Sequence, residues 1–286
     1  MSGVNEKPYK RDKLQTIPLS ENKILNFKES KLLEKKFGEE KIKNFSTADL
    51  SHLYFYHYKC ESVDDCRWGC AWRSMQSVLK FQLSFSNQNR DQDISFYNLF
   101  MKYGKKDTLL DIFLKMNEKQ DATEAFNALM DKEFAPHETQ SGWAEPFISQ
   151  LVLYDFGFEG ELILINDYSN HNYAPKSVFN RMLTFEEFKE LLKKHFAQKN
   201  PGPIIMDDSY SSLSIIGIKF DEESNNIELI IMDPHVVGDP EKGLYIVVLN
   251  EQGEFFDLIP FEHVLCSRSV FFNNKKPWMA YIPKTN

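Results

Sequence analysis

A cysteine placed between a polar loop and an amphipathic helix constrains this chain more than any other feature. The segment runs from Asp64 to Gln76. From Ala71 onward, apolar residues recur at the spacing of one helix face, and these are Ala71, Met75, Val78 and Leu79. Gly69 allows the backbone to turn tightly just before Cys70. The sequence therefore predicts that Cys70 lies in the first turn of a helix.

That position suits a nucleophilic thiol. The first turn of a helix has unpaired N–H groups and the positive end of the helix dipole, which stabilise a thiolate and lower the pKa of a cysteine. A buried cysteine more often serves as a small apolar residue in a core. Position alone therefore leaves both interpretations of Cys70 open.

A second polar motif follows the largely apolar run Ile227–Met232, which is typical of a buried strand. The next residues are Asp233, Pro234 and His235. Because side chains at i and i+2 of an extended segment point to the same side, Asp233 and His235 are expected to lie next to each other. A carboxylate beside an imidazole stabilises the imidazolium of a thiolate–imidazolium pair. An ordinary Asp-Pro turn followed by a surface histidine is the alternative.

Together the two motifs resemble those of the Ufm-specific proteases, papain-like cysteine proteases that process and remove the ubiquitin-fold modifier Ufm. The matching residues are Tyr56-His57-Tyr58, Asp64-Asp65, Trp68-Gly69-Cys70-Ala71, Arg73-Ser74, Gln76, Asp233-Pro234-His235 and Gly238. The similarity spans residues 50–286 and is strong at both motifs and weak between them.

The resemblance implies a papain-like fold and assigns a role to each motif residue. Cys70 is expected to be the nucleophile, His235 the base, and Asp233 the residue that orients the imidazole. Tyr58, twelve residues before Cys70, matches the tyrosine that supplies an oxyanion-hole donor in the family. The aromatic cluster around Tyr58 is also typical of a core or an edge strand.

Two tryptophans, Trp68 and Trp143, are candidate substrate contacts, and Trp143 fits a place in the core equally well. The chain also departs from the family pattern at two places. Cys66-Arg67 stands before Trp68, where the family has a small residue or glycine. Asp207-Asp208 replaces glycines in the loop before the strands that lead to Asp233. The second departure concerns substrate fit, because in the family that loop lies near the tunnel for the modifier's tail.

Composition argues against several other classes of protein. Apolar residues make up 42% and aromatic residues 14% of the 286 residues, which is enough for a substantial core and too much for global disorder. The net charge of −8 argues against nucleic-acid binding. No apolar run reaches membrane-spanning length. The 4 cysteines without a secretory signal indicate a reducing compartment, so a cytoplasmic location is expected.

Zinc binding is the alternative for the segment that is rich in cysteine and histidine. Its residues are His52, His57, Cys60, Cys66 and Cys70. The cysteine spacing contains no Cys-x-x-Cys pair, which argues against a structural zinc site. We therefore expect neither a metal nor another cofactor.

The first 50 residues differ in charge from the rest. They carry a net charge of +3, whereas residues 51–286 carry −11. Their apolar residues follow only a loose helical pattern. Residues 1–50 are therefore expected to form a mobile or partly helical extension, and residues 51–286 the protease domain.

The order of the expected elements is that of an α+β protein. Helices are expected at 71–79, 96–103, 109–116, 123–134, 143–154 and, after a Thr184-x-x-Glu187 capping box, at 185–197. Strands are expected at 161–165, 204–206, 213–220, 227–233, 244–249 and 279–282. Helices followed by an antiparallel sheet indicate an α+β fold, with Cys70 at a helix N-terminus packed against that sheet.

The sequence thus predicts a thiol protease that cleaves after the C-terminal glycine of a ubiquitin-like modifier, either in its precursor or in its conjugates. An adaptor protein is a further candidate partner. The alternative enzyme is an autophagy-type protease that processes a lipid-conjugated modifier, but Tyr58 and Ala71-Trp72-Arg73 favour the Ufm type. A non-catalytic modifier-binding module and a structural protein are alternatives from other classes. The joint presence of Cys70, Asp233 and His235 argues against the binding module, and in a structural protein Cys70 would be no more reactive than Cys266.

Overall fold

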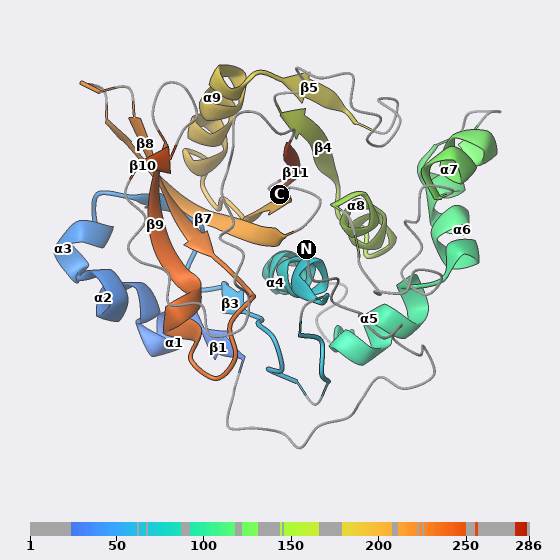
Figure 1. Ribbon diagram of the computed structural model, residues 1–286, viewed down its shortest axis with the longest axis horizontal. Coiled ribbons are helices and arrows are strands. Elements are labelled where there is room, and N and C mark those ends of the chain that lie inside the picture. The colour runs from blue at the N-terminus through green and yellow to red at the C-terminus, as the bar shows by residue number, and fades with distance from the viewer. Residues whose placement is uncertain are drawn as a thin grey trace, which may run out of the picture.

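The computed structural model describes residues 24–61, 63–66, 68–86, 92–117, 122–130, 144, 146–165, 179–207, 211–221, 223–224, 226–249, 255–256 and 278–284. Within these residues, helices pack on both faces of one large twisted sheet (Figure 1). None of the described helices combines the length and the apolar content needed to cross a membrane.

The large sheet is built from strands that come mostly from the second half of the chain. They are β2 (Ser46–Thr47), β4 (Gly160–Ile165), β5 (Arg181–Leu183), β6 (Ile204–Asp207), β7 (Ser212–Asp221), β8 (Asn226–Met232), β9 (Leu244–Leu249), β10 (Phe255–Phe256) and β11 (Trp278–Pro283). Their order is β10-β9-β8-β7-β6-β11-β4-β5, and β2 pairs with β7 outside this order. The described neighbours are antiparallel except for β4 and β5, which are parallel. A separate antiparallel pair joins β1 (Leu25–Asn26) to β3 (Tyr54–Phe55).

Most helices precede the long strands in the chain. They are α1 (Phe27–Ser30), α2 (Leu32–Phe37), α3 (Glu39–Ile42), α4 (Cys70–Phe85), α5 (Phe96–Tyr103), α6 (Lys106–Met116), α7 (Ala122–Met130), α8 (Pro146–Asp155) and α9 (Phe185–Phe196). A 3-10 turn, η2 (Pro240–Gly243), precedes β9. The predicted capping box is present at the start of α9, where Thr184 and Glu187 exchange hydrogen bonds. Pro146 is the first residue of α8, where its missing N–H removes no helical hydrogen bond.

Two hydrophobic clusters hold the layers together, one on each face of the sheet. On β4, Leu162 and Leu164 join the cluster that contains α4 to α8, whereas Ile163 and Ile165 join the cluster that contains α1, α2, α3 and α9. The alternation follows from the two-residue period of a strand. Both faces of the sheet are therefore buried, which explains why strands such as β9 and β11 are apolar at nearly every position.

The α+β class is confirmed, with Cys70 at the N-terminus of α4 and α4 packed against the antiparallel sheet. The expected strands correspond to β4, β6, β7, β8, β9 and β11 with small shifts at their ends. Several elements were not predicted, namely β1, β2, β3, β5 and β10, and each of these is only two or three residues long. Segments of that length contain too few residues to show a period.

Residues 24–50, which were expected to belong to a mobile or partly helical extension, form short helices and strands that pack against the rest of the protein. Phe27, Leu33 and Ala48 are almost completely buried in the cluster shared with α9, and the Ala48 N–H donates to Ile216 O at 2.8 Å. The apolar pattern looked loose because these residues are divided among short helices and strands, not placed on one amphipathic helix. Residues 1–23 lie outside the described residues, and for them the extension stays a prediction.

This packing predicts that Leu33→Ala destabilises the protein by about 2–5 kcal/mol, because it removes a fully buried side chain and leaves a cavity. The measurement is the free energy of unfolding in urea. Leu114→Ala is the matched control, since Leu114 is 38% exposed and its truncation should change that free energy by about 0.5 kcal/mol or less. Equal effects of the two substitutions would contradict the packing of residues 24–50.

Candidate active site

Cys70 is the first residue of α4, as predicted. The residue before it, Gly69, has φ −84° and ψ 2°, so the position does not require the conformational freedom of glycine. It requires space instead. A Cβ on Gly69 would lie 2.6 Å from both Cβ and Oδ2 of Asp65, which is too close for any side chain. The glycine before the cysteine thus allows the preceding loop to pack directly against the start of the helix.

The Asp-Pro-His motif follows directly after β8 and brings Asp233 and His235 together. His235 Nδ1 donates a short hydrogen bond to Asp233 Oδ1, and the His235 N–H donates to the same oxygen at 3.0 Å. Both side chains are buried. Because Nδ1 faces the carboxylate, Nε2 is the ring nitrogen that can exchange a proton with a thiol.

A tyrosine on β9 holds the other oxygen of this carboxylate. The Tyr245 hydroxyl donates to Asp233 Oδ2 at 3.2 Å, and the Asp233 N–H donates to Gly243 O at 2.8 Å. The sequence analysis missed Tyr245. It lies opposite Ile231 in the β8–β9 ladder, two residues before Asp233, so only the pairing of these strands shows that the two side chains share a face.

The charges of Cys70 and His235 stabilise each other. Burial by itself raises the pKa of the Cys70 thiol, but the positive imidazole of His235 and hydrogen bonds from His235, the Ser212 backbone and the Tyr58 hydroxyl lower it below the ordinary value. Burial lowers the pKa of His235, but the negative charges of Asp233 and Cys70 raise it well above the ordinary value. The arrangement therefore favours a thiolate–imidazolium pair.

Tyr58 lies beside this pair, as the twelve-residue spacing predicted. Its N–H donates to Pro234 O at 3.0 Å, which ties the segment after β3 to the Asp-Pro-His motif. Its ring meets the His235 ring edge-on at 5.4 Å between centroids. The buried phenol thus places a hydroxyl donor next to the Cys70 sulfur. The structure brings Tyr58, Cys70, Asp233 and His235 into one site.

Of the two candidate tryptophans, only Trp68 lies among the described residues. Trp68 is 7% exposed and packs in the helical cluster, with ring centroids 5.4 Å from Phe96 and 5.2 Å from Phe100. This packing gives Trp68 a structural role and lends no support to the predicted substrate contact. Trp143 lies outside the described residues.

Each of the two dipeptides that depart from the family pattern has one residue in the described part of the chain. Cys66 is partly buried and Asp207 is buried at the end of β6, while Arg67 and Asp208 lie outside the described residues. In the described part of the chain, no group of three or more His, Cys, Asp or Glu side chains is arranged to hold a metal ion.

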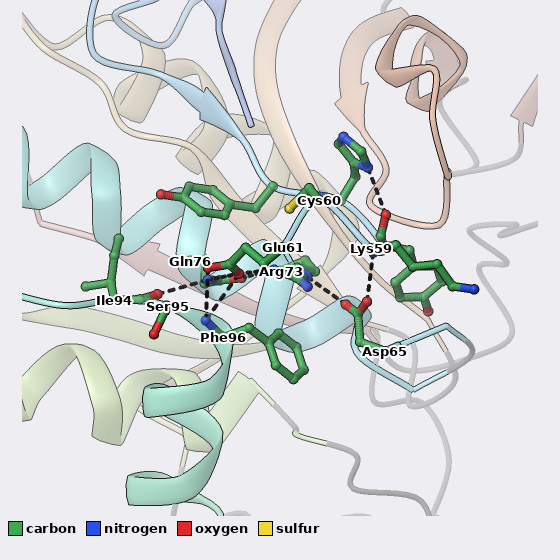
Figure 2. Close-up of polar contacts among 12 residues, drawn as sticks. Lys59, Cys60, Glu61, Asp65, Arg73, Gln76, Ile94, Ser95 and Phe96 are labelled. Carbon is green, nitrogen blue, oxygen red and sulfur yellow. Dashed lines mark hydrogen bonds and ion pairs between the residues drawn. The ribbon is translucent and has the colours of Figure 1, made fainter. Parts of the chain in front are cut away.

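A buried Arg73 connects α4 to the loop before it, as Figure 2 shows. Arg73 Nε donates to Asp65 Oδ2 at 2.6 Å, and Arg73 Nη1 forms a short ion pair with Glu61 and donates to Gln76 Oε1 at 2.9 Å. These hydrogen bonds give Arg73 and Gln76 a structural role, because they hold the preceding loop against α4.

A helix that begins with a cysteine, packed on an antiparallel sheet that carries an Asp–His pair, defines the papain-like class of cysteine peptidase folds. Comparison with protein families agrees. The model of peptidase family C78 matches residues 161–253, which include Asp233 and His235. The chain is thus similar to the family of Ufm-specific proteases over this segment, and the resemblance seen in the sequence is confirmed.

The chain was also compared with curated proteins and with solved structures. No match was found among curated proteins. Among solved structures, the crystal structure of UfSP from C. elegans aligns with a TM-score of 0.49 and 14% sequence identity, and the alignment covers 85% of this chain and 34% of that chain. This chain therefore spans about a third of the length of the protein in that structure.

Because their surroundings differ, the described cysteines should react with an alkylating reagent at different rates. Cys70 should react with iodoacetamide at neutral pH, with a midpoint below its ordinary pKa of 9.0. Burial raises the pKa of Cys60 to about 11 and that of Cys66 to about 12, so both should react slowly. Mass spectrometry of the labelled peptides over a pH series measures all three.

His235→Ala supplies the control for this measurement. It removes the positive charge and a hydrogen bond but leaves the burial of the thiol, so the Cys70 midpoint should move upward. Equal labelling of Cys60 and Cys70 at pH 7 in the unaltered protein would contradict the electrostatics of the site.

Proposed function

We propose that this protein is a thiol protease that cleaves the peptide or isopeptide bond after the C-terminal glycine of the modifier Ufm. The observation that carries the proposal is the contact of Cys70 with His235, whose ring is held by Asp233 and flanked by Tyr58. A nucleophile, a base, an orienting group and an oxyanion donor are the parts that acyl transfer needs.

The first half of the reaction forms an acyl-enzyme. The Cys70 thiolate attacks the carbonyl carbon of the terminal glycine, and a C–S bond forms while negative charge moves onto the carbonyl oxygen. The Tyr58 hydroxyl donates to that oxygen, which stabilises the transition state more than the substrate. The His235 imidazolium gives its proton to the leaving amine, the C–N bond breaks, and a thioester remains.

The second half releases the modifier. His235, now neutral, takes a proton from a water molecule that attacks the thioester. The C–S bond breaks, the modifier leaves as a free carboxylic acid that loses its proton to solvent, and the thiolate–imidazolium pair is restored. Asp233 accepts hydrogen bonds from His235 and Tyr245 and so keeps the imidazole oriented in both halves of the reaction.

Ufm is the proposed substrate because the family match and the sequence motifs both point to Ufm-specific proteases. Maturation of the precursor, removal from conjugates and assistance by an adaptor protein belong to the same proposal. An autophagy-type protease that processes a lipid-conjugated modifier is the alternative enzyme. The free thiols of Cys60, Cys66 and Cys70 support the proposal of a reducing, cytoplasmic location.

Cleavage of tail-extended precursors tests the function. Precursors of Ufm, of an autophagy modifier and of ubiquitin are offered in parallel to the full chain, and the products are identified by mass spectrometry. Ufm should be cut directly after its terminal glycine. Cys70→Ala should abolish cleavage while it leaves binding of the Ufm precursor intact, because the apolar face of α4 is unchanged.

The other outcomes separate the alternatives. Preferential cleavage of the autophagy precursor would replace the proposed substrate. Binding of the Ufm precursor without cleavage would favour the non-catalytic modifier-binding module. Full activity of Cys70→Ala would rule out the mechanism.

Tyr58→Phe tests the oxyanion donor, because it keeps the ring and deletes the hydroxyl. Turnover should fall about 10²–10³-fold, as is typical when one such donor is removed, while binding of the uncleaved precursor stays nearly unchanged. Tyr56→Phe is the matched control and should keep turnover near that of the unaltered protein. Tyr58→Phe with turnover within a few-fold of the unaltered protein would make Tyr58 a core residue only.

A further inference from the structure

We infer that Asp65 is a positioning residue that fixes the nucleophile Cys70 and the oxyanion donor Tyr58 relative to each other. The inference rests on the proposed function for its catalytic meaning. Asp65 is completely buried, and it accepts hydrogen bonds from the residues that flank these two groups. Asp65 therefore acts through the backbone and not on the reacting atoms.

Asp65 binds both ends of the segment that separates Tyr58 from Cys70. Its Oδ1 accepts the N–H of Lys59, the residue after Tyr58, at 2.8 Å. Its main-chain oxygen accepts the N–H of Gly69, the residue before Cys70, at 2.8 Å. One residue thus joins the backbone next to the donor to the backbone next to the nucleophile.

Both contacts occur at positions with a local restriction, a positive φ at Lys59 and a lack of space for a side chain at Gly69. Lys59 has φ +58°, in the left-handed region that a residue with a side chain adopts only when its surroundings stabilise it. Its hydrogen bond to Asp65 supplies part of that stabilisation. Gly69 lies so close to the Asp65 side chain that any Cβ would collide with it. The two positions are therefore specified by Asp65 and not by local propensity.

Arg73 keeps the Asp65 side chain in place. It occupies the first turn of α4, three residues after Cys70, and donates to Asp65 Oδ2 at 2.6 Å while its N–H donates to Gly69 O at 3.0 Å. Its guanidinium carbon lies 4.4 Å from the centre of the Phe96 ring. Figure 2 shows the guanidinium between Asp65 and Glu61, with Asp65 toward Lys59 and Glu61 toward Ser95 and Phe96.

The geometry also identifies a matched control within the same network. Glu61 is a second carboxylate on Arg73, but its other partners are Gln76 and the N–H of Phe96. Neither of these flanks Tyr58 or Cys70. Asp65→Asn and Glu61→Gln therefore make the same chemical change and both weaken the hold on Arg73, yet only Asp65→Asn alters the side chain that accepts the Lys59 N–H.

Alkylation of Cys70 over a pH series tests the inference without any protease substrate. The Tyr58 hydroxyl lowers the pKa of the Cys70 thiol, so displacement of Tyr58 should raise the pH midpoint of alkylation, as Tyr58→Phe should. Removal of the Asp65 negative charge alone would lower the midpoint. Asp65→Asn should raise it by about as much as Tyr58→Phe, with no further rise in the double variant, and Glu61→Gln should leave it unchanged.

Cleavage kinetics give the second measurement. Asp65→Asn should lower kcat about 10²-fold with KM nearly unchanged, which is the scale expected when a reacting group is displaced by about 1 Å. Combined with Tyr58→Phe, it should lower kcat little further, because both substitutions remove the same interaction. If Asp65→Asn gives no cooperative unfolding transition, Arg73→Lys takes its place, since it keeps the positive charge but loses the Nε–H held by Asp65, and the midpoint should again rise.

Three results would overturn the inference. The first is an alkylation midpoint that is unchanged or lowered in Asp65→Asn, or in Arg73→Lys where that variant is used instead. The second is a rise of the midpoint in Glu61→Gln that equals the rise in Asp65→Asn. The third is a double variant in which the kcat effects of Asp65→Asn and Tyr58→Phe multiply. Failure of the proposed function is a different result, namely no cleavage of any precursor by the unaltered chain. In that case the alkylation midpoints still decide whether Asp65 positions Tyr58 against Cys70.

Discussion

The contact between the Cys70 thiolate and the His235 imidazolium is the interaction on which the rest of the site depends. Neither charge is stable alone in a buried position, because burial raises the pKa of the thiol and lowers that of the imidazole. Each charge therefore stabilises the other, and Asp233 supplies the net negative charge that keeps the imidazole protonated. The carboxylate in turn is held by Tyr245 and by its place at the end of β8.

The two halves of this pair come from different layers of the fold. Cys70 begins α4, whose apolar face packs in the helical cluster, and His235 follows β8, an interior strand of the sheet. The packing of α4 on the sheet therefore sets the distance between the Cys70 thiol and the His235 ring. A second buried charge network, formed by Glu61, Asp65 and Arg73, holds the loop that leads into α4. A buried charge destabilises the fold unless it is fully paired, and the partners stay paired only where the packing holds them in place. Both networks therefore depend on the same rigid packing.

Local sequence was enough to predict the main helices, the long strands and three of the site residues. A helix beginning at Cys70 and a side-by-side Asp233 and His235 follow from backbone periods of 3.6 and 2.0 residues, which operate over a few neighbours. Tyr58 came from the family resemblance and not from its local surroundings. The packed residues 24–50 were missed because their apolar side chains are distributed over elements too short to show a period.

The sequence by itself determined which chemical groups are present and which local segment carries each of them. Only the tertiary structure decided that these segments meet, because Cys70 and His235 are 165 positions apart in the chain and their contact depends on the packing of a helix on a sheet. The same holds for Tyr245, which reaches Asp233 through the register of β8 and β9. It also holds for Trp68, which the packing buries against Phe96 and Phe100. Register and interlayer packing are sums over many distant contacts, and no local pattern records them.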